Sequence, residues 1–300
     1  MSNNLELREV RKAYGDFVAV DGVSLAVPPG AVFGLLGQNG AGKTTSIRMI
    51  MDILAPDRGE VLFFGRPRRL EDLRRVGYLP EERGLYRKMT VFDHLLFFAE
   101  LHGVERRRAG KLITEWLERV ELGAWAKARV EALSKGMQQK IQLVGTILHD
   151  PDILILDEPF SGLDPIAQAL FKDLIGDFKA RGKTILFSTH ILEQAEKLCD
   201  HICLISHGKV ILAGELAALK RERGGNVYRL TTSADRVTVA ATRGVAEVLD
   251  QPSGLRLVLA ADADPAAVLR KLVQHGDVTD FRSEVPDLET LFIQAVRHAN

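Results

Sequence analysis

Gly37-Gln-Asn-Gly-Ala-Gly-Lys-Thr-Thr45 is the stretch that decides the fold of this chain. It follows an apolar run at residues 31–36 and opens into a helical pattern at residues 46–51. A strand, a glycine-rich turn and a helix start give the context that a phosphate-binding loop needs. The glycines let the backbone turn successive N–H groups toward a phosphate, and the helix N-terminus adds partial positive charge.

The side chains of this loop carry the expected chemistry. Lys43 is expected to reach the β- and γ-phosphates of a nucleotide, and Thr44 to ligate Mg²⁺. The other predicted nucleotide contacts in the loop are Gly37, Asn39, Gly40, Gly42 and Thr45.

Composition excludes several classes of protein. The 300 residues are 46% apolar, which suffices for a conventional core and favours about two domains. The 40 Lys+Arg balance the 40 Asp+Glu, so the net charge gives no general reason to expect nucleic-acid binding. No uninterrupted apolar stretch approaches the roughly 20 residues that cross a bilayer, and residues 1–7 do not resemble a signal peptide. We therefore expect a soluble, cytoplasmic protein in which Cys199 and Cys203 are buried free thiols.

Strand and helix patterns alternate from the start of the chain to about Arg223. Continuous apolar runs such as residues 153–156 are typical of strands covered on both faces, as in a parallel sheet. The predicted strands are residues 5–10, 31–36, 61–64, 76–79, 153–156, 184–188 and 202–206. The predicted helices are residues 91–101, 107–119, 137–148, 166–179 and 192–198. The sequence therefore predicts an α/β fold of the phosphate-loop ATPase kind.

The pattern changes at Gly224-Gly225. Short strand-like pieces follow, and helices open at Asp264-Pro265 and after Pro286. We therefore expect one domain over residues 1–223 and a small accessory α+β domain over residues 226–300. A regulatory or dimer-supporting role is our hypothesis for the second domain.

Two carboxylates end a second apolar strand, at Asp157 and Glu158. An acidic strand end of this kind completes the nucleotide site of phosphate-loop ATPases. We expect Asp157 to hold the Mg²⁺ shell, and Glu158 to polarise the water that attacks the γ-phosphate.

Three further segments narrow the class. Leu133-Ser-Lys-Gly-Met137 precedes a helix, Ser161-Gly-Leu-Asp164 follows the acidic strand, and His190 ends the strand predicted at residues 184–188. Together with the phosphate loop, in this order and spacing over residues 5–215, they resemble the nucleotide-binding domain of ABC ATPases.

The resemblance implies a role for each matching position and a helical subdomain at about residues 88–150. Tyr14 would stack on adenine, and Ser134 and Gly136 would contact the γ-phosphate held by the opposite subunit. Asp164 would link the two sites of the dimer, and His190 would contact the γ-phosphate. Lys135 and Met137 depart from the glycine and glutamine most common in the family signature.

Another departure lies at Glu81, where most family members carry a glutamine that touches Mg²⁺ and the attacking water. A carboxylate near the polyphosphate is unfavourable unless the metal or Arg83 compensates it, so we expect Glu81 to face Mg²⁺ only in the closed state. The surrounding segment, residues 81–90, resembles a subgroup of bacterial ATPase subunits similar to sodium and drug exporters, whose members commonly carry a small C-terminal domain.

The resemblance implies an ATP-hydrolysing subunit of an ABC transporter, most simply an exporter, peripheral on the inner face of the cell membrane. Its partners would be an integral-membrane permease and a second ABC ATPase, identical or related, with ATP and Mg²⁺ bound between the two. Candidates for the permease-docking surface are Leu85, Tyr86, Met89 and the helix of residues 91–101. A soluble ABC-superfamily ATPase acting on ribosomes or DNA is the main alternative, and a kinase or GTP-binding switch a weaker one.

Overall fold

A computed structural model describes residues 3–82, 84–223, 227–251, 254–260, 262–284 and 286–299. The chain divides into two compact units, one of Met1–Gly214 with Ala299–Asn300 and one of Glu215–His298. The division falls before α7 (Leu216–Arg223), whereas the sequence placed a boundary at Gly224-Gly225, which lies outside the described residues.

A six-stranded sheet forms the centre of the first unit, in the order β10-β9-β3-β8-β7-β6. Its strands are β3 (Val32–Leu36), β6 (Val76–Leu79), β7 (Ile153–Asp157), β8 (Thr184–Thr189), β9 (His201–Ser206) and β10 (Lys209–Glu215). The strand pairs β3–β8, β3–β9, β6–β7 and β7–β8 are parallel. Every residue of β3, β7 and β8 is buried, as expected of parallel strands covered on both faces.

A second, antiparallel sheet was not foreseen from the sequence. It has the order β2-β1-β4-β5 and contains β1 (Leu5–Tyr14), β2 (Phe17–Val27), β4 (Arg58–Phe63) and β5 (Arg66–Pro67). The predicted strands at residues 5–10 and 61–64 therefore pair with each other and not with the parallel strands. β2 and β10 were missed altogether. Apolar patterns predict strands, but they do not say which strand pairs with which.

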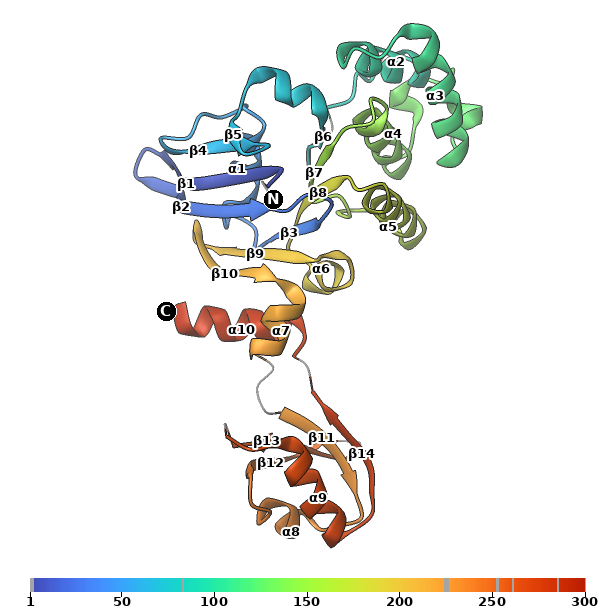
Figure 1. Ribbon diagram of the computed structural model, residues 1–300. Coiled ribbons are helices and arrows are strands. Elements are labelled where there is room, and N and C mark those ends of the chain that lie inside the picture. The colour runs from blue at the N-terminus through green and yellow to red at the C-terminus, as the bar shows by residue number, and fades with distance from the viewer. Residues whose placement is uncertain are drawn as a thin grey trace. The chain divides into compact units, whose positions relative to one another are not determined.

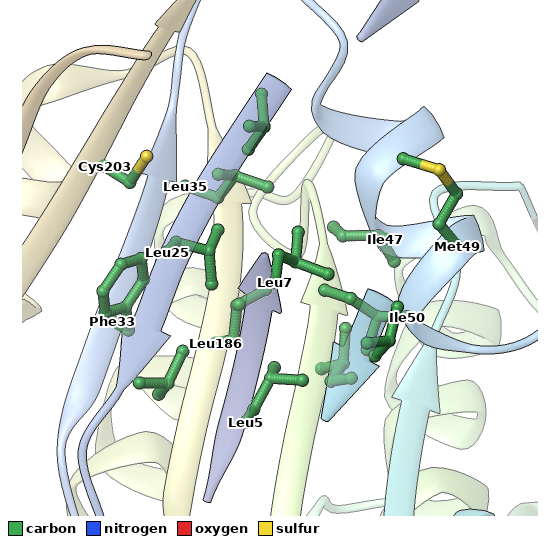
Figure 2. Close-up of a cluster of buried hydrophobic side chains, with 14 of the residues drawn as sticks. Leu5, Leu7, Leu25, Phe33, Leu35, Ile47, Met49, Ile50, Leu186 and Cys203 are labelled. Atoms are coloured by element: carbon green, nitrogen blue, oxygen red, sulfur yellow. The ribbon is translucent and has the colours of Figure 1, made fainter. Parts of the chain in front are cut away.

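One hydrophobic core joins the two sheets through α1 (Lys43–Ile50). Figure 2 shows side chains from the antiparallel sheet, the parallel sheet and α1 meeting in this cluster. The labelled members are Leu5, Leu7, Leu25, Phe33, Leu35, Ile47, Met49, Ile50, Leu186 and Cys203. The helix that opens at the phosphate loop is thus fixed between two sheets.

Helices form the rest of the first unit. α4 (Lys135–Ile147) and α5 (Pro165–Ala180) contribute to a core with β7 and β8. A second helical core joins α4 to α2 (Val91–Leu101) and α3 (Arg106–Arg119). The remaining elements are α6 (Leu192–Leu198) and three short 3₁₀ helices, η1 (Leu70–Arg75), η2 (Gly123–Trp125) and η3 (Val130–Ala132).

The second unit contains a four-stranded antiparallel sheet in the order β12-β13-β11-β14. Its elements are α7, β11 (Val227–Thr232), α8 (Arg236–Ala240), β12 (Val245–Gln251), β13 (Gly254–Leu259), α9 (Pro265–His275), β14 (Val278–Ser283) and α10 (Leu288–Ala299). α8 and α9 cover one face of the sheet (Figure 1), where Leu230, Leu257 and Leu272 form the core.

Both cysteines are free thiols, with Cys203 buried and Cys199 only partly exposed. Burial raises the pKa of each thiol, that of Cys203 to about 12.

In the described part of the chain, no helix is long and apolar enough to cross a membrane.

His94, His102 and His149 line a cavity of about 330 Å³, and of these His94 is buried. His94 is only 2% exposed and its Nδ1 has no hydrogen-bond partner. Burial lowers the pKa of His94 to about 4. The neighbouring His149 also has its pKa lowered to about 4, chiefly by burial, and its ring stacks on His102 at 3.8 Å.

We predict that the protein loses stability as the pH falls from 6.5 to 4. In this range the unfolded chain protonates His94 while the folded chain keeps it neutral, so protons favour unfolding. A shift of this size is worth on the order of 3 kcal/mol at its full extent. His94→Phe should remove that part of the pH dependence of the unfolding free energy, measured by urea denaturation. Exposed His207, changed to Asn, is the control, and an equal pH slope in both variants would contradict the prediction.

Candidate functional site

The phosphate loop connects β3 to α1 through backbone conformations that require glycine. Gly40 and Gly42 have φ angles of 80° and 108°. A Cβ on Gly42 would lie 2.5 Å from the carbonyl oxygen of Ala19, and one on Gly37 would lie 2.3 Å from that of Ile205. The loop is therefore pressed against neighbouring backbone, and its shape depends on the absence of side chains. Gly42 is also the N-cap of α1, so the next N–H groups begin the helix.

Lys43 is buried and turned back onto the loop. Its Nζ donates to the carbonyl oxygens of Gly37 at 2.8 Å and Gln38 at 3.3 Å. The same nitrogen lies 3.2 Å from Glu158 Oε1. The ammonium group of Lys43, which the sequence predicts to bind phosphates, is thus surrounded here by loop carbonyl oxygens and the Glu158 carboxylate.

Glu158 lies just past the end of β7, between two basic side chains. While Oε1 faces Lys43, Oε2 lies 3.0 Å from Nδ1 of His190, which follows β8. An ionised carboxylate only accepts hydrogen bonds, so we assign the proton of this contact to Nδ1. Glu158 has a φ of 48°, unusual for a residue with a side chain, and its N–H donates to Ser188 Oγ at 2.9 Å.

Asp157, the last residue of β7, has one oxygen engaged and one unpartnered. Oδ1 accepts from Ser188 Oγ at 2.5 Å and from Thr44 Oγ1 at 3.4 Å. Oδ2 is buried and accepts no hydrogen bond from the described residues. Burial raises the pKa of Asp157, and nearby Glu158 raises it further, although the bonds from Ser188 and Thr44 oppose both effects.

These oxygens fit a magnesium ion. A hydroxyl and a carboxylate with a free buried oxygen are the hard ligands that Mg²⁺ takes beside phosphate oxygens. No group of three His, Cys, Asp or Glu side chains that could hold a metal occurs among the described residues. The arrangement therefore suits an ion that arrives with a nucleotide, and not one held by the protein alone.

A cavity of about 400 Å³ opens beside Thr44 and Asp157, and Glu81 is among the residues that line it. Gln142 Nε2, on α4, donates to the carbonyl oxygens of Pro80 and Glu82 at 3.3 and 3.4 Å, which ties the Glu81 segment to the helices. Arg83, the expected compensating charge, lies outside the described residues.

Tyr78 lies in the wall of this cavity. Burial raises its pKa to about 12, and the negative charge of Asp157 adds to the shift. The phenol therefore stays protonated over the whole working range of pH and can act only as a neutral hydroxyl.

Ser134, Gly136 and Asp164 lie close together at the starts of α4 and α5. Ser134 is the exposed N-cap of α4, and its Oγ accepts from Met137 N at 3.3 Å. Asp164 is the exposed N-cap of α5, and its Oδ2 lies 4.0 Å from where a Cβ on Gly136 would be. Within the described ranges, no hydrogen bond or ion pair connects Ser134 or Asp164 to the phosphate loop.

Tyr14 ends β1 and is 49% exposed, so its ring has a free surface to stack on a base. Asn39 and Gly40 are exposed at the tip of the loop, and Thr45 is half-buried on α1.

Sequence reasoning missed the residues that position the site. Ser188 donates to Asp157 and accepts from the backbone of Glu158, and Gln142 holds the Glu81 segment. Ser188 could have been found, because it precedes His190 by two residues at the end of a buried strand. Gln142 gives no such signal, since a glutamine inside a helix is common.

Comparisons of sequence agree with this geometry. A family model described as "ABC transporter" matches residues 20–161, and one described as "ATP-binding protein DrrA1-3-like, C-terminal domain" matches residues 214–296. The uncharacterized ABC transporter ATP-binding protein YhaQ of Bacillus subtilis is 40% identical over 292 residues, 97% of this chain and 98% of the relative. The Nod factor export ATP-binding protein I of Paraburkholderia xenovorans is 43% identical over 218 residues, 72% of each chain.

Solved structures resemble the same part of the chain. An ATP binding subunit of an ABC transporter matches with a TM-score of 0.68 and 33% identity, covering 73% of this chain and 93% of that one. The cbiO1 protein of Clostridium perfringens, described as part of the ABC transporter complex cbiONQ, matches with a TM-score of 0.63 and 25% identity, covering 74% and 94%. The fold class and the family resemblance predicted from the sequence are confirmed.

Proposed function

The chain belongs to the ABC transporter ATP-binding family, and on that premise we propose that this ATPase powers an exporter through a separately encoded membrane permease. The observation that supports ATP hydrolysis by this chain is the position of the Glu158 carboxylate. It lies between Lys43 and His190, next to a second carboxylate with a free buried oxygen. This is the set of groups that in-line attack on a γ-phosphate requires.

Lys43 and Glu158 change partners when ATP binds. The phosphates offer Lys43 a stronger acceptor than two carbonyl oxygens, and its ammonium group then moves away from Glu158. The freed Glu158 carboxylate accepts a proton from the attacking water, while Nδ1–H of His190 donates to the opposite oxygen. Nε2 of His190 donates to the γ-phosphate when the ring also carries a proton there. The ground-state ion pair therefore restrains the base until a nucleotide is present.

Thr44 and Asp157 would hold Mg²⁺, and Glu81 would approach it in the closed state. Bound there, the ion would neutralise charge on the β- and γ-phosphates. Ser188 keeps Asp157 aimed at the site by donating at 2.5 Å, which leaves Oδ2 for the ion.

Ser134, Gly136 and Asp164 would serve a phosphate loop of another subunit. They lie next to each other but have no bond to their own loop among the described residues. Two ABC subunits, identical or related, would therefore enclose two ATP molecules head to tail. Hydrolysis removes γ-phosphate contacts made by both subunits, and the pair loses the differential binding that kept it closed.

The permease would contact α2 and the segment before it. Tyr86 is 51% exposed and packs edge-on against Phe97 at 5.3 Å, and Leu101 is 61% exposed. Leu85 lines the nearby cavity of about 330 Å³. An apolar surface beside a cavity suits a short permease helix and would place the chain on the inner face of the membrane. Export is favoured by the Nod factor export relative.

We predict that Glu158→Gln binds ATP about 3–10-fold more tightly and turns it over at least about 100-fold more slowly. The amide cannot pair with Lys43 as a carboxylate does, so the ammonium group is released to the phosphates at lower cost. Fluorescent-nucleotide titration and single-turnover hydrolysis measure the two effects. Glu115→Gln, which removes an exposed charge from α3, is the control and should change neither effect. Unchanged ATP affinity in Glu158→Gln would show that the resting ion pair does not restrain Lys43.

A tagged chain isolated with ATP and Mg²⁺ from detergent-solubilised membranes should carry a polytopic membrane protein, identified by mass spectrometry. Leu101→Asp should lose that partner and keep its ATPase activity, because a charge on the exposed end of α2 disfavours an apolar contact. Val237→Asp alters an exposed apolar residue of α8 and should keep the partner. Recovery of ribosomal proteins or nucleic acid without a membrane protein would instead support the soluble alternative.

A further inference from the structure

Three arginines lie in one row across the sheet of the second unit. Arg229, in the central strand β11, pairs in register with Arg256 of β13 on one side and with Arg282 of β14 on the other. Residues directly opposite each other in antiparallel strands share a face of the sheet. The next residue of β11, Leu230, belongs to the core beneath α8 and α9. The arginine row therefore occupies the face opposite those two helices.

The flanking arginines have carboxylate partners and the central one does not. Arg256 Nε lies 2.7 Å from Glu284 Oε2, and Arg282 Nε lies 3.2 Å from Asp280 Oδ2. Arg229 Nε and Arg256 Nε are both buried without a hydrogen bond, but Arg256 has the nearby Glu284 carboxylate, whereas no described carboxylate forms an ion pair with Arg229. The guanidinium group in the middle of the row thus lacks its own counter-charge.

The remaining charge on this face does not neutralise Arg229. By strand alternation, Glu247 of β12 shares the face, and it pairs with Val258 and not with an arginine. The side chains of Arg256 and Arg282 are 39% and 63% exposed, so ligands can reach the row.

Ion pairs with Glu284 and Asp280 account for the two flanking arginines, but folding alone gives no reason for Arg229. Like charges directly opposite each other destabilise a sheet, and these side chains add nothing to the core on the other face. A feature that costs stability and leaves a guanidinium without an acceptor is typical of a binding site.

We propose that Arg229, together with Arg256 and Arg282, binds a phosphate group of a phosphoester. Neighbouring strands lie about 4.8 Å apart, so the three guanidinium groups span roughly 10 Å. A phosphate offers more oxygens and more charge than a carboxylate, and it matches several planar guanidinium forks at once. A carboxylate of the chain already shows that the face accommodates an oxyanion, because Glu284 accepts from Gln251 Nε2 at 3.3 Å while it pairs with Arg256.

The phosphoester could be a free metabolite or a lipid headgroup, and two probes distinguish these sources. With the nucleotide site of the full chain kept filled with ADP, binding of sn-glycerol 3-phosphate is measured by calorimetry. Binding to phosphatidylglycerol vesicles, against phosphatidylcholine vesicles, is measured by flotation. Binding of the free ester identifies a metabolite site, and binding to phosphatidylglycerol alone identifies a lipid site. Binding to neither probe would overturn the proposal.

Arg229→Gln should weaken binding at least tenfold, and Glu284→Gln should strengthen it about threefold by removing a competing carboxylate. Arg243→Gln, an exposed change in the same unit, should leave binding unaltered.

Without phosphoester, Arg229→Gln should keep or raise the unfolding midpoint, because it relieves repulsion in the row. Equal binding by Arg229→Gln and the unchanged chain, or a lowered midpoint without an effect on binding, would overturn the proposal. The result does not depend on ATP hydrolysis in the first unit.

Discussion

The carboxylate of Glu158 between Lys43 and His190 is the interaction on which the account of the site depends. Each of the three residues follows a different strand of the parallel sheet, and parallel strands end at a common edge. Ser188 fixes the turn by bonding to both acidic neighbours, Asp157 and Glu158. The sheet itself therefore positions Glu158, Asp157 and Lys43, the residues proposed as base, metal ligand and phosphate-binding lysine.

The proposed function assigns to one chain only part of a catalytic site. The phosphate loop of the chain supplies the backbone N–H groups and Lys43 for the phosphates. Ser134 and Asp164 begin helices α4 and α5, and among the described residues they make no bond to that loop. In the proposed function, ATP would provide the contacts that hold two subunits together, and hydrolysis would remove them. Gln142 ties the segment beside the proposed metal ligands to α4, which connects the helices to the site.

Much of the fold follows from the sequence, because buried strands and capped helices have strong local patterns. The helices predicted at residues 91–101 and 192–198 have those bounds in the structure. The antiparallel sheet did not follow, since pairing of residues 5–14 with 58–63 is a long-range choice that periodicity does not encode. The loop and acidic motifs predicted site residues that the structure brings together, Lys43 with Glu158 and Thr44 with Asp157. The ion pair of Lys43 with Glu158 joins positions far apart in the chain, and no local pattern predicts it.

The shared ATP site is tested most directly by mixing two inactive variants of the chain. Lys43→Ala disables the phosphate loop, and Ser134→Arg blocks the surface offered to the opposite subunit, so each variant alone should hydrolyse no ATP. Mixed in equal amounts, they should form dimers with one intact site and recover on the order of a quarter of the activity of the unchanged chain. A mixture that stays inactive, or full activity in Ser134→Arg alone, would contradict the shared site.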